Sequence, residues 1–137
     1  MVRKLLKVTV AGVLGMAAWL IAYSSGSRAA DDKVVEISEI MRKSFKDKNN
    51  YKTSIGAAAK AGKWDDATKL AKEWADLGAV IGKNKPPKGT DESWKMQCEK
   101  FAANTKTILK ACEDKDAKAV TKGLGSFDCM GCHKAHR

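Results

Sequence analysis

The sequence predicts an all-α protein, folded as an antiparallel up-down-up-down four-helix bundle. Apolar residues recur at three- and four-residue spacings in four segments, and no segment shows the strict apolar–polar alternation of a strand. The glycines and the two prolines stand mostly at the breaks between these segments. Four amphipathic helices with short joints pack most simply as an up-down-up-down bundle.

The first 29 residues have the order of a secretory signal peptide. A basic head is followed by a 16-residue uncharged, mostly apolar run (residues 8–23) and a small-x-small pattern (residues 27–29). The run is shorter than the ~20 residues that span a hydrocarbon core. We therefore predict a signal peptide at 1–29 and one domain at 30–137, exported to the periplasm. An uncleaved anchor, which would keep the protein at a membrane, is the alternative.

The predicted domain stays basic after the signal is removed, with 22 Lys and Arg residues against 16 Asp and Glu. Its positive charges are interleaved with acidic ones rather than clustered, which argues against a nucleic-acid partner. A lysine-rich surface could steer an acidic protein towards it. The alternative is that the lysines only face solvent and attract no particular partner.

The first two helices are predicted over residues 32–61 and 64–81. Asn49 and Asn50 are a weak point where the first helix could kink, and Gly62 ends it. The second helix carries acidic residues in its first turn, where the helix dipole favours them, and ends at Gly82. The following segment, residues 83–89, holds both prolines and is too stiff to continue a helix.

The last two helices are predicted from Thr90 or Asp91 to about Cys112, and from about Asp116 to the end of the chain. In an up-down-up-down bundle the fourth helix finishes where the first begins. Residues near the C-terminus then become spatial neighbours of residues near position 40.

The stretch CMGCH, residues 129–133, carries the chemistry. On a helix Cys129, Cys132 and His133 share one face. A Cys129–Cys132 disulfide would leave His133 without a role, and a zinc site normally takes its second ligand pair from a distant segment. Covalent attachment of one haem c fits every residue: two thioether bonds from the cysteines, and His133 as a ligand of the iron.

Met41 is the candidate for the opposite face of the iron. The domain has only two other methionines: Met130 lies between the attachment cysteines, and Met96 lies off the apolar stripe of its helix. Met41 is on the apolar stripe of the first helix, near the end of the bundle where the fourth helix finishes. Its alternative role is a core methionine that fills a gap.

Together the signal peptide, four helices and C-terminal CMGCH resemble the class II cytochromes c, the cytochrome c prime family and its low-spin relatives. The resemblance implies a haem lodged between the helices, with Met41 in EIMRKSF at the place of the methionine ligand. It also implies a basic residue near the haem, here Arg137, although His136 replaces the aromatic residue usual before it. Family members are often homodimers.

The residues and the resemblance together predict an electron carrier rather than an enzyme, with redox proteins as its partners. Members of the family without the methionine bind small gases such as nitric oxide, and a five-coordinate gas-binding protein is the alternative.

Of the remaining candidates, Cys98 and Cys112 lie on an apolar stripe and are expected to be buried thiols. An intermolecular disulfide is their alternative. His136 is expected to face solvent at a frayed helix end.

Overall fold

The computed structural model describes residues 34–137, which belong to the unit Asp32–Arg137. The predicted signal peptide lies outside the described residues. Within residues 34–137 all regular secondary structure is helical, and the helices form a bundle, as the sequence predicted. None of the helices in this part of the chain is both long and apolar enough to cross a membrane.

The first predicted helix consists of three pieces. The α-helix α1 (Ile37–Met41) continues into a π-helical turn, η1 (Arg42–Lys46), and a separate helix α2 (Tyr51–Lys60) follows. The predicted weak point is therefore a complete break. The side chain of Asn50 causes the restart, because its carbonyl oxygen accepts a hydrogen bond from the Thr53 N–H at 3.0 Å.

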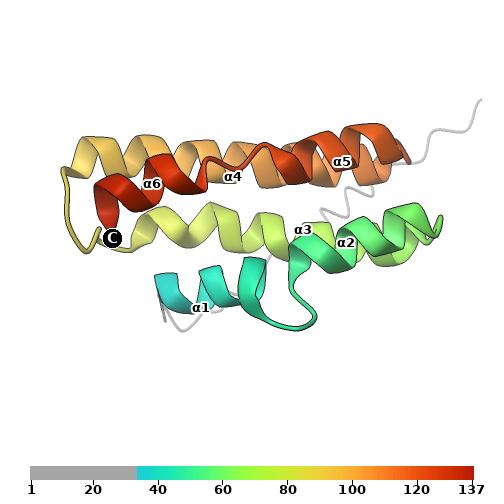
Figure 1. Ribbon diagram of the computed structural model, residues 1–137, viewed down its shortest axis with the longest axis horizontal. Helices are drawn as coiled ribbons and strands as arrows, with labels where there is room; N and C mark the ends of the chain where they lie inside the picture. The colour runs from blue at the N-terminus through green and yellow to red at the C-terminus, as the bar shows by residue number, and fades with distance from the viewer. Residues whose placement is uncertain (1–33) are drawn as a thin grey trace, which may run out of the picture. The chain divides into compact units, whose positions relative to one another are not determined.

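The second and third predicted helices are confirmed. Helix α3 (Trp64–Val80) ends in a 3₁₀ turn, η2 (Ile81–Lys83), and α4 (Asp91–Glu113) is capped by Thr90 as predicted. The two helices lie side by side along most of their length (Figure 1). A Cβ at Gly78 of α3 would lie 2.5 Å from Thr105 Oγ1 of α4, so the glycine permits this close approach.

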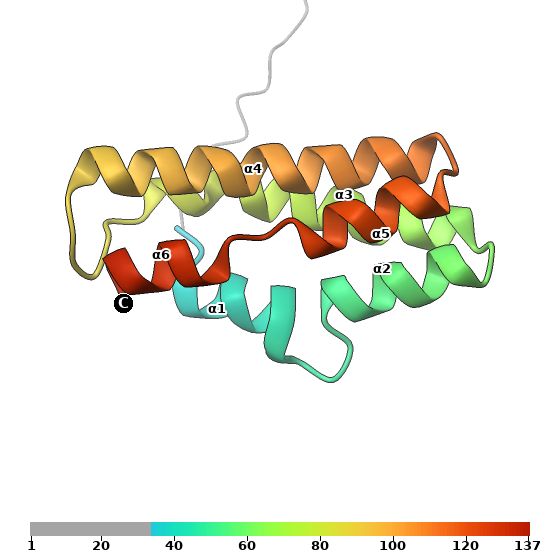
Figure 2. The same cartoon turned by 45° about the horizontal axis from the view of Figure 1, so that its top comes forward.

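The prediction of one continuous fourth helix is wrong. The chain forms α5 (Ala117–Gly125) and α6 (Cys129–His136), which follow one another beside α4 (Figure 2). Between them Phe127 packs into the bundle, with its ring stacked on Trp74 at a centroid distance of 5.0 Å. Asp128 then starts α6 by accepting a hydrogen bond from the Gly131 N–H at 2.8 Å.

Two clusters of buried side chains form the core. The larger one includes Trp74, Ile55 and Ile108 and joins α2, α3, α4 and α5. The smaller one contains Ile40, Ile81, Trp94 and Cys98, with Met41 and Cys132 packed against it. The smaller cluster therefore lies where the beginning of the described chain meets its end.

Candidate functional site

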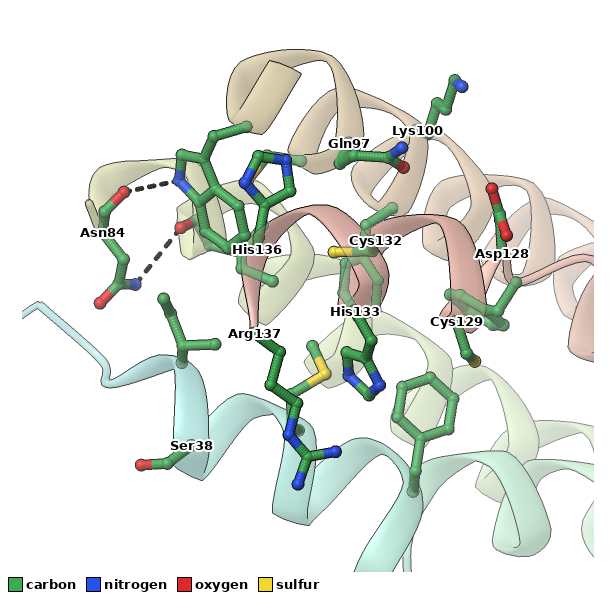
Figure 3. A pocket seen from close by; sticks show the side chains of 18 of the residues that line it. Ser38, Asn84, Gln97, Lys100, Asp128, Cys129, Cys132, His133, His136 and Arg137 are labelled. Carbon is green, nitrogen blue, oxygen red and sulfur yellow. Dashed lines mark hydrogen bonds between the residues drawn. The ribbon is translucent and has the colours of Figure 1, made fainter. Parts of the chain in front are cut away.

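A cavity of about 1080 Å³ opens between α1, η1, α4 and α6 (Figure 3). Its volume slightly exceeds the range of about 300–1,000 Å³ that is usual for small-molecule and cofactor sites. The connection between α3 and α4 contributes a further wall through Asn84, Lys85 and Pro87. Segments from the whole length of the described chain thus meet around one space.

All five residues that the sequence singled out line this cavity: Met41, Cys129, Cys132, His133 and Arg137. The Met41 and Cys132 side chains are half-buried, whereas those of His133 and Arg137 are exposed. The other two methionines of the described chain, Met96 and Met130, are 48% and 76% exposed and do not line the cavity. The folded chain brings Met41 to the space that the CMGCH segment borders.

Helix α6 presents the CMGCH residues as one unit. Its cap at Asp128 fixes the first turn, and the Cys132 N–H continues the helix with a bond to the Asp128 carbonyl at 3.3 Å. Figure 3 shows Cys129, Cys132 and His133 on this short helix, at the cavity. A helix places residues at i, i+3 and i+4 on one side, which is the arrangement that the motif predicted.

All four cysteines are free thiols, so no disulfide joins Cys129 to Cys132. The prediction that Cys98 and Cys112 are buried is confirmed. Burial raises the pKa of the Cys98 thiol to about 11, with the nearby Cys132 adding to the shift. Burial also raises the pKa of the Cys132 thiol, and Asp128 adds to it. These thiols remain protonated near neutral pH.

The other lining residues fit a large, flat, apolar group that carries acidic substituents. Phe45, Phe101 and Phe127 supply an aromatic floor, and their rings lie 5.3 to 6.4 Å apart between centroids. Five basic residues and two acidic ones also line the space: Arg42, Lys46, Lys85, Lys100, Arg137, Glu36 and Asp128. A haem has this combination of an apolar ring and two carboxylates, so the residues present fit it.

His136 does not face solvent, which corrects the expectation from the sequence. Its side chain is 3% exposed, and both ring nitrogens are hydrogen-bonded, to the Lys88 carbonyl oxygen at 2.9 Å and to Ser93 Oγ at 3.1 Å. Its ring also meets the Trp94 ring edge-on. The helix end is held by segments distant in sequence, and these contacts leave no periodic signal in the sequence.

No protein-family model matches this chain, and neither does any curated protein or solved structure. Among residues 34–137 no group of three or more His, Cys, Asp or Glu side chains is arranged to hold a metal ion.

Proposed function

We propose that this protein is an exported monohaem c-type cytochrome of the class II kind, and that it carries electrons rather than catalysing a reaction. One observation carries the proposal. Met41 near the beginning of the described chain and the CMGCH segment at its end are about 90 positions apart in sequence, yet they line the same cavity. The motif alone supports covalent haem attachment, and the shared cavity supports Met41 as a further ligand of the iron.

Each residue has a distinct role in this proposal. The Cys129 and Cys132 sulfurs would hold the haem by thioether bonds to its vinyl groups, His133 would supply an imidazole nitrogen to the iron, and Met41 would supply a thioether sulfur. Haem bound there would supply an iron that changes between two oxidation states. The aromatic residues would pack against the haem ring, and Arg137, with the other basic residues, would offer partners for the haem carboxylates.

The charges around the cavity support a docking role as well. Five basic residues against two acidic ones border the space, and this imbalance favours an acidic redox partner. Export to the periplasm agrees with the predicted signal peptide and with haem attachment, which takes place outside the cytoplasm.

We also infer the up-down-up-down, antiparallel order of the bundle. Short connections support it: residues 61–63 join α2 to α3, residues 84–90 follow η2, and residues 114–116 join α4 to α5. Short helix–helix connections favour antiparallel neighbours. The shared cavity of α1 and α6 supports the same order, since it requires the last helix to finish beside the first.

The test is the optical spectrum of Met41→Ala, with Met96→Ala as the matched control. We expect six-coordinate low-spin haem in the unaltered protein, and a high-spin spectrum in Met41→Ala because the iron loses its sulfur ligand. The midpoint potential of that variant should fall on the order of 0.1 V. Met96 is exposed and outside the cavity, so its loss should change neither quantity.

Two other results would redirect the proposal. A high-spin spectrum in the unaltered protein would favour the five-coordinate, gas-binding alternative, in which Met41 only packs. Failure to bind haem covalently, after expression together with haem-attachment enzymes, would exclude a cytochrome of either kind.

A further inference from the structure

The connection between η2 and α4, residues 84–90, makes hydrogen bonds to both of the chain segments that carry the proposed iron ligands. One bond reaches Val35, just before α1, and α1 itself carries Met41. The other reaches the last turn of α6, which carries His133. Both prolines of the chain lie in this connection, and their fixed φ angles restrict its conformations.

Asn84 makes the bonds on the α1 side. Its side-chain amide donates to the Val35 carbonyl oxygen at 2.9 Å. The same amide also donates to the Ile81 carbonyl oxygen at 3.3 Å. Val35 lies two residues before the start of α1. The half-buried Asn84 side chain thus ties the entry of α1 to the end of η2.

His136 makes the bonds on the α6 side. The Lys88 carbonyl can only accept, so the neutral ring must carry its proton on Nδ1 and donate it there at 2.9 Å. Nε2 is then the acceptor for the Ser93 hydroxyl at 3.1 Å. His136 follows His133 by three residues, slightly less than one helical turn, so anchoring one restricts the other.

Trp94 joins the two sides. Its indole N–H donates to the Asn84 carbonyl oxygen at 2.7 Å, and its ring centroid lies 5.3 Å from that of His136. Gly89 completes the contact: a Cβ there would lie 2.6 Å from His136 Nδ1 and 2.8 Å from the Ala135 carbonyl oxygen. The connection therefore lies directly against the end of α6.

We propose that Asn84, Trp94 and His136, with the connection between them, form a bracket that sets the separation of α1 from α6. Asn84 and His136 are then positioning residues: neither needs to touch the iron, but together they fix Met41 relative to His133. The consequence for the iron rests on the proposed function, whereas the bracket itself consists only of protein groups and is tested on the haem-free chain.

The test compares three variants by hydrogen exchange of the haem-free chain. Asn84→Ala removes the α1 side, and His136→Phe keeps an aromatic ring but removes both bonds on the α6 side. Asn50→Ala is the matched control, because Asn50 is also an asparagine whose side chain bonds to the backbone, but it lies in the break before α2. Should His136→Phe fail to fold, Ser93→Ala removes one of the two bonds instead.

We expect Asn84→Ala to accelerate exchange chiefly in α1, and His136→Phe chiefly in α6, each by about tenfold. In the haem-loaded protein both variants should lower the fraction of iron with bound methionine, whereas Asn50→Ala should leave that fraction unchanged. Ser93→Ala should act on α6 like His136→Phe, to a smaller extent.

Two results would overturn the bracket. One is acceleration spread evenly over all helices, or no acceleration, in both bracket variants. The other is α6 exchange in the unaltered haem-free chain that is already as fast as in an unfolded chain. If the local acceleration occurs but the loaded protein never shows bound methionine, the bracket is supported and the assignment of Met41 fails.

Discussion

At the residue scale, the surroundings of the four cysteines distinguish those that pack in the core from one that is accessible to react. Cys98 and Cys112 are buried on the inner side of α4, whereas Cys129 is exposed at the start of α6. Cys98 also borders the cavity, but burial keeps its thiol protonated. Cys98 is therefore a poor competitor for a reaction that needs an accessible, reactive sulfur.

This contrast predicts the order of alkylation in the native haem-free chain. Cys129 should react first with iodoacetamide, and Cys98 much more slowly, because only its thiolate reacts and its pKa is about 11. The rate at Cys98 should therefore rise about tenfold for each pH unit between pH 8 and pH 10. Peptide mass spectrometry after timed quenching measures both.

The control for this prediction is the chain in denaturant, where all four cysteines should react at similar rates. Equal rates at Cys98 and Cys129 in the native chain would contradict the burial of Cys98.

At the scale of elements, the connection before α4 links two helices and also packs against the end of α6. It holds a glycine with positive φ, Gly89 at 89°, directly against His136. The backbone conformation disfavours any side chain, and the neighbouring atoms leave no room for one. Two separate constraints therefore act at one residue.

Gly62, which follows α2, allows these two constraints to be separated. Its φ is 71°, but apart from its two chain neighbours no residue has an atom within 4 Å of the place where a Cβ would stand. We expect Gly62→Ala to lower the free energy of unfolding by about 1–2 kcal/mol, from backbone strain alone. Gly89→Ala should cost about 2–4 kcal/mol, because overpacking against His136 is added. Urea denaturation of both variants measures the difference, and equal costs would show that the contact with α6 is weak.

At the scale of the whole molecule, the core is divided unequally. The larger cluster, around Trp74, reaches the cavity of about 1080 Å³ only through the aromatic rings packed against it, whereas three of the four buried residues of the smaller cluster line the cavity directly. A group bound in that cavity would complete the packing at this end of the bundle. A ligand that binds only the folded state stabilises it.

If the proposed haem is that group, we expect the protein produced without haem attachment to fold but to be less stable, by about 3 kcal/mol or more. Amide exchange should remain slow around Ile55 and Ile108 and become faster around Ile40 and Ile81. Chemical denaturation and hydrogen exchange of the two forms measure these changes. Equal stability of the two forms would indicate that no group completes this cavity.

Local patterns in the sequence determined much of this protein. The 3.6-residue periodicity predicted α3 and α4, and Thr90 marked the start of α4, because helix geometry and capping depend on residues within one or two turns. The CMGCH spacing likewise predicted a shared helical face, and the count of methionines singled out Met41, which lines the cavity. The helix and motif predictions need only residues close together in sequence. The prediction of Met41 needs only a choice among the three methionines of the predicted domain.

Contacts between distant segments decided the rest. The caps that restart the first and last predicted helices, at Asn50 and Asp128, are local. Between α5 and α6, however, Phe127 packs against Trp74, more than 50 positions away. His136 is buried because Lys88 and Ser93, more than 40 positions away, bond its ring. Whether a polar side chain at a helix end meets solvent or a partner depends on what the fold places beside it. Only the tertiary structure supplies that information.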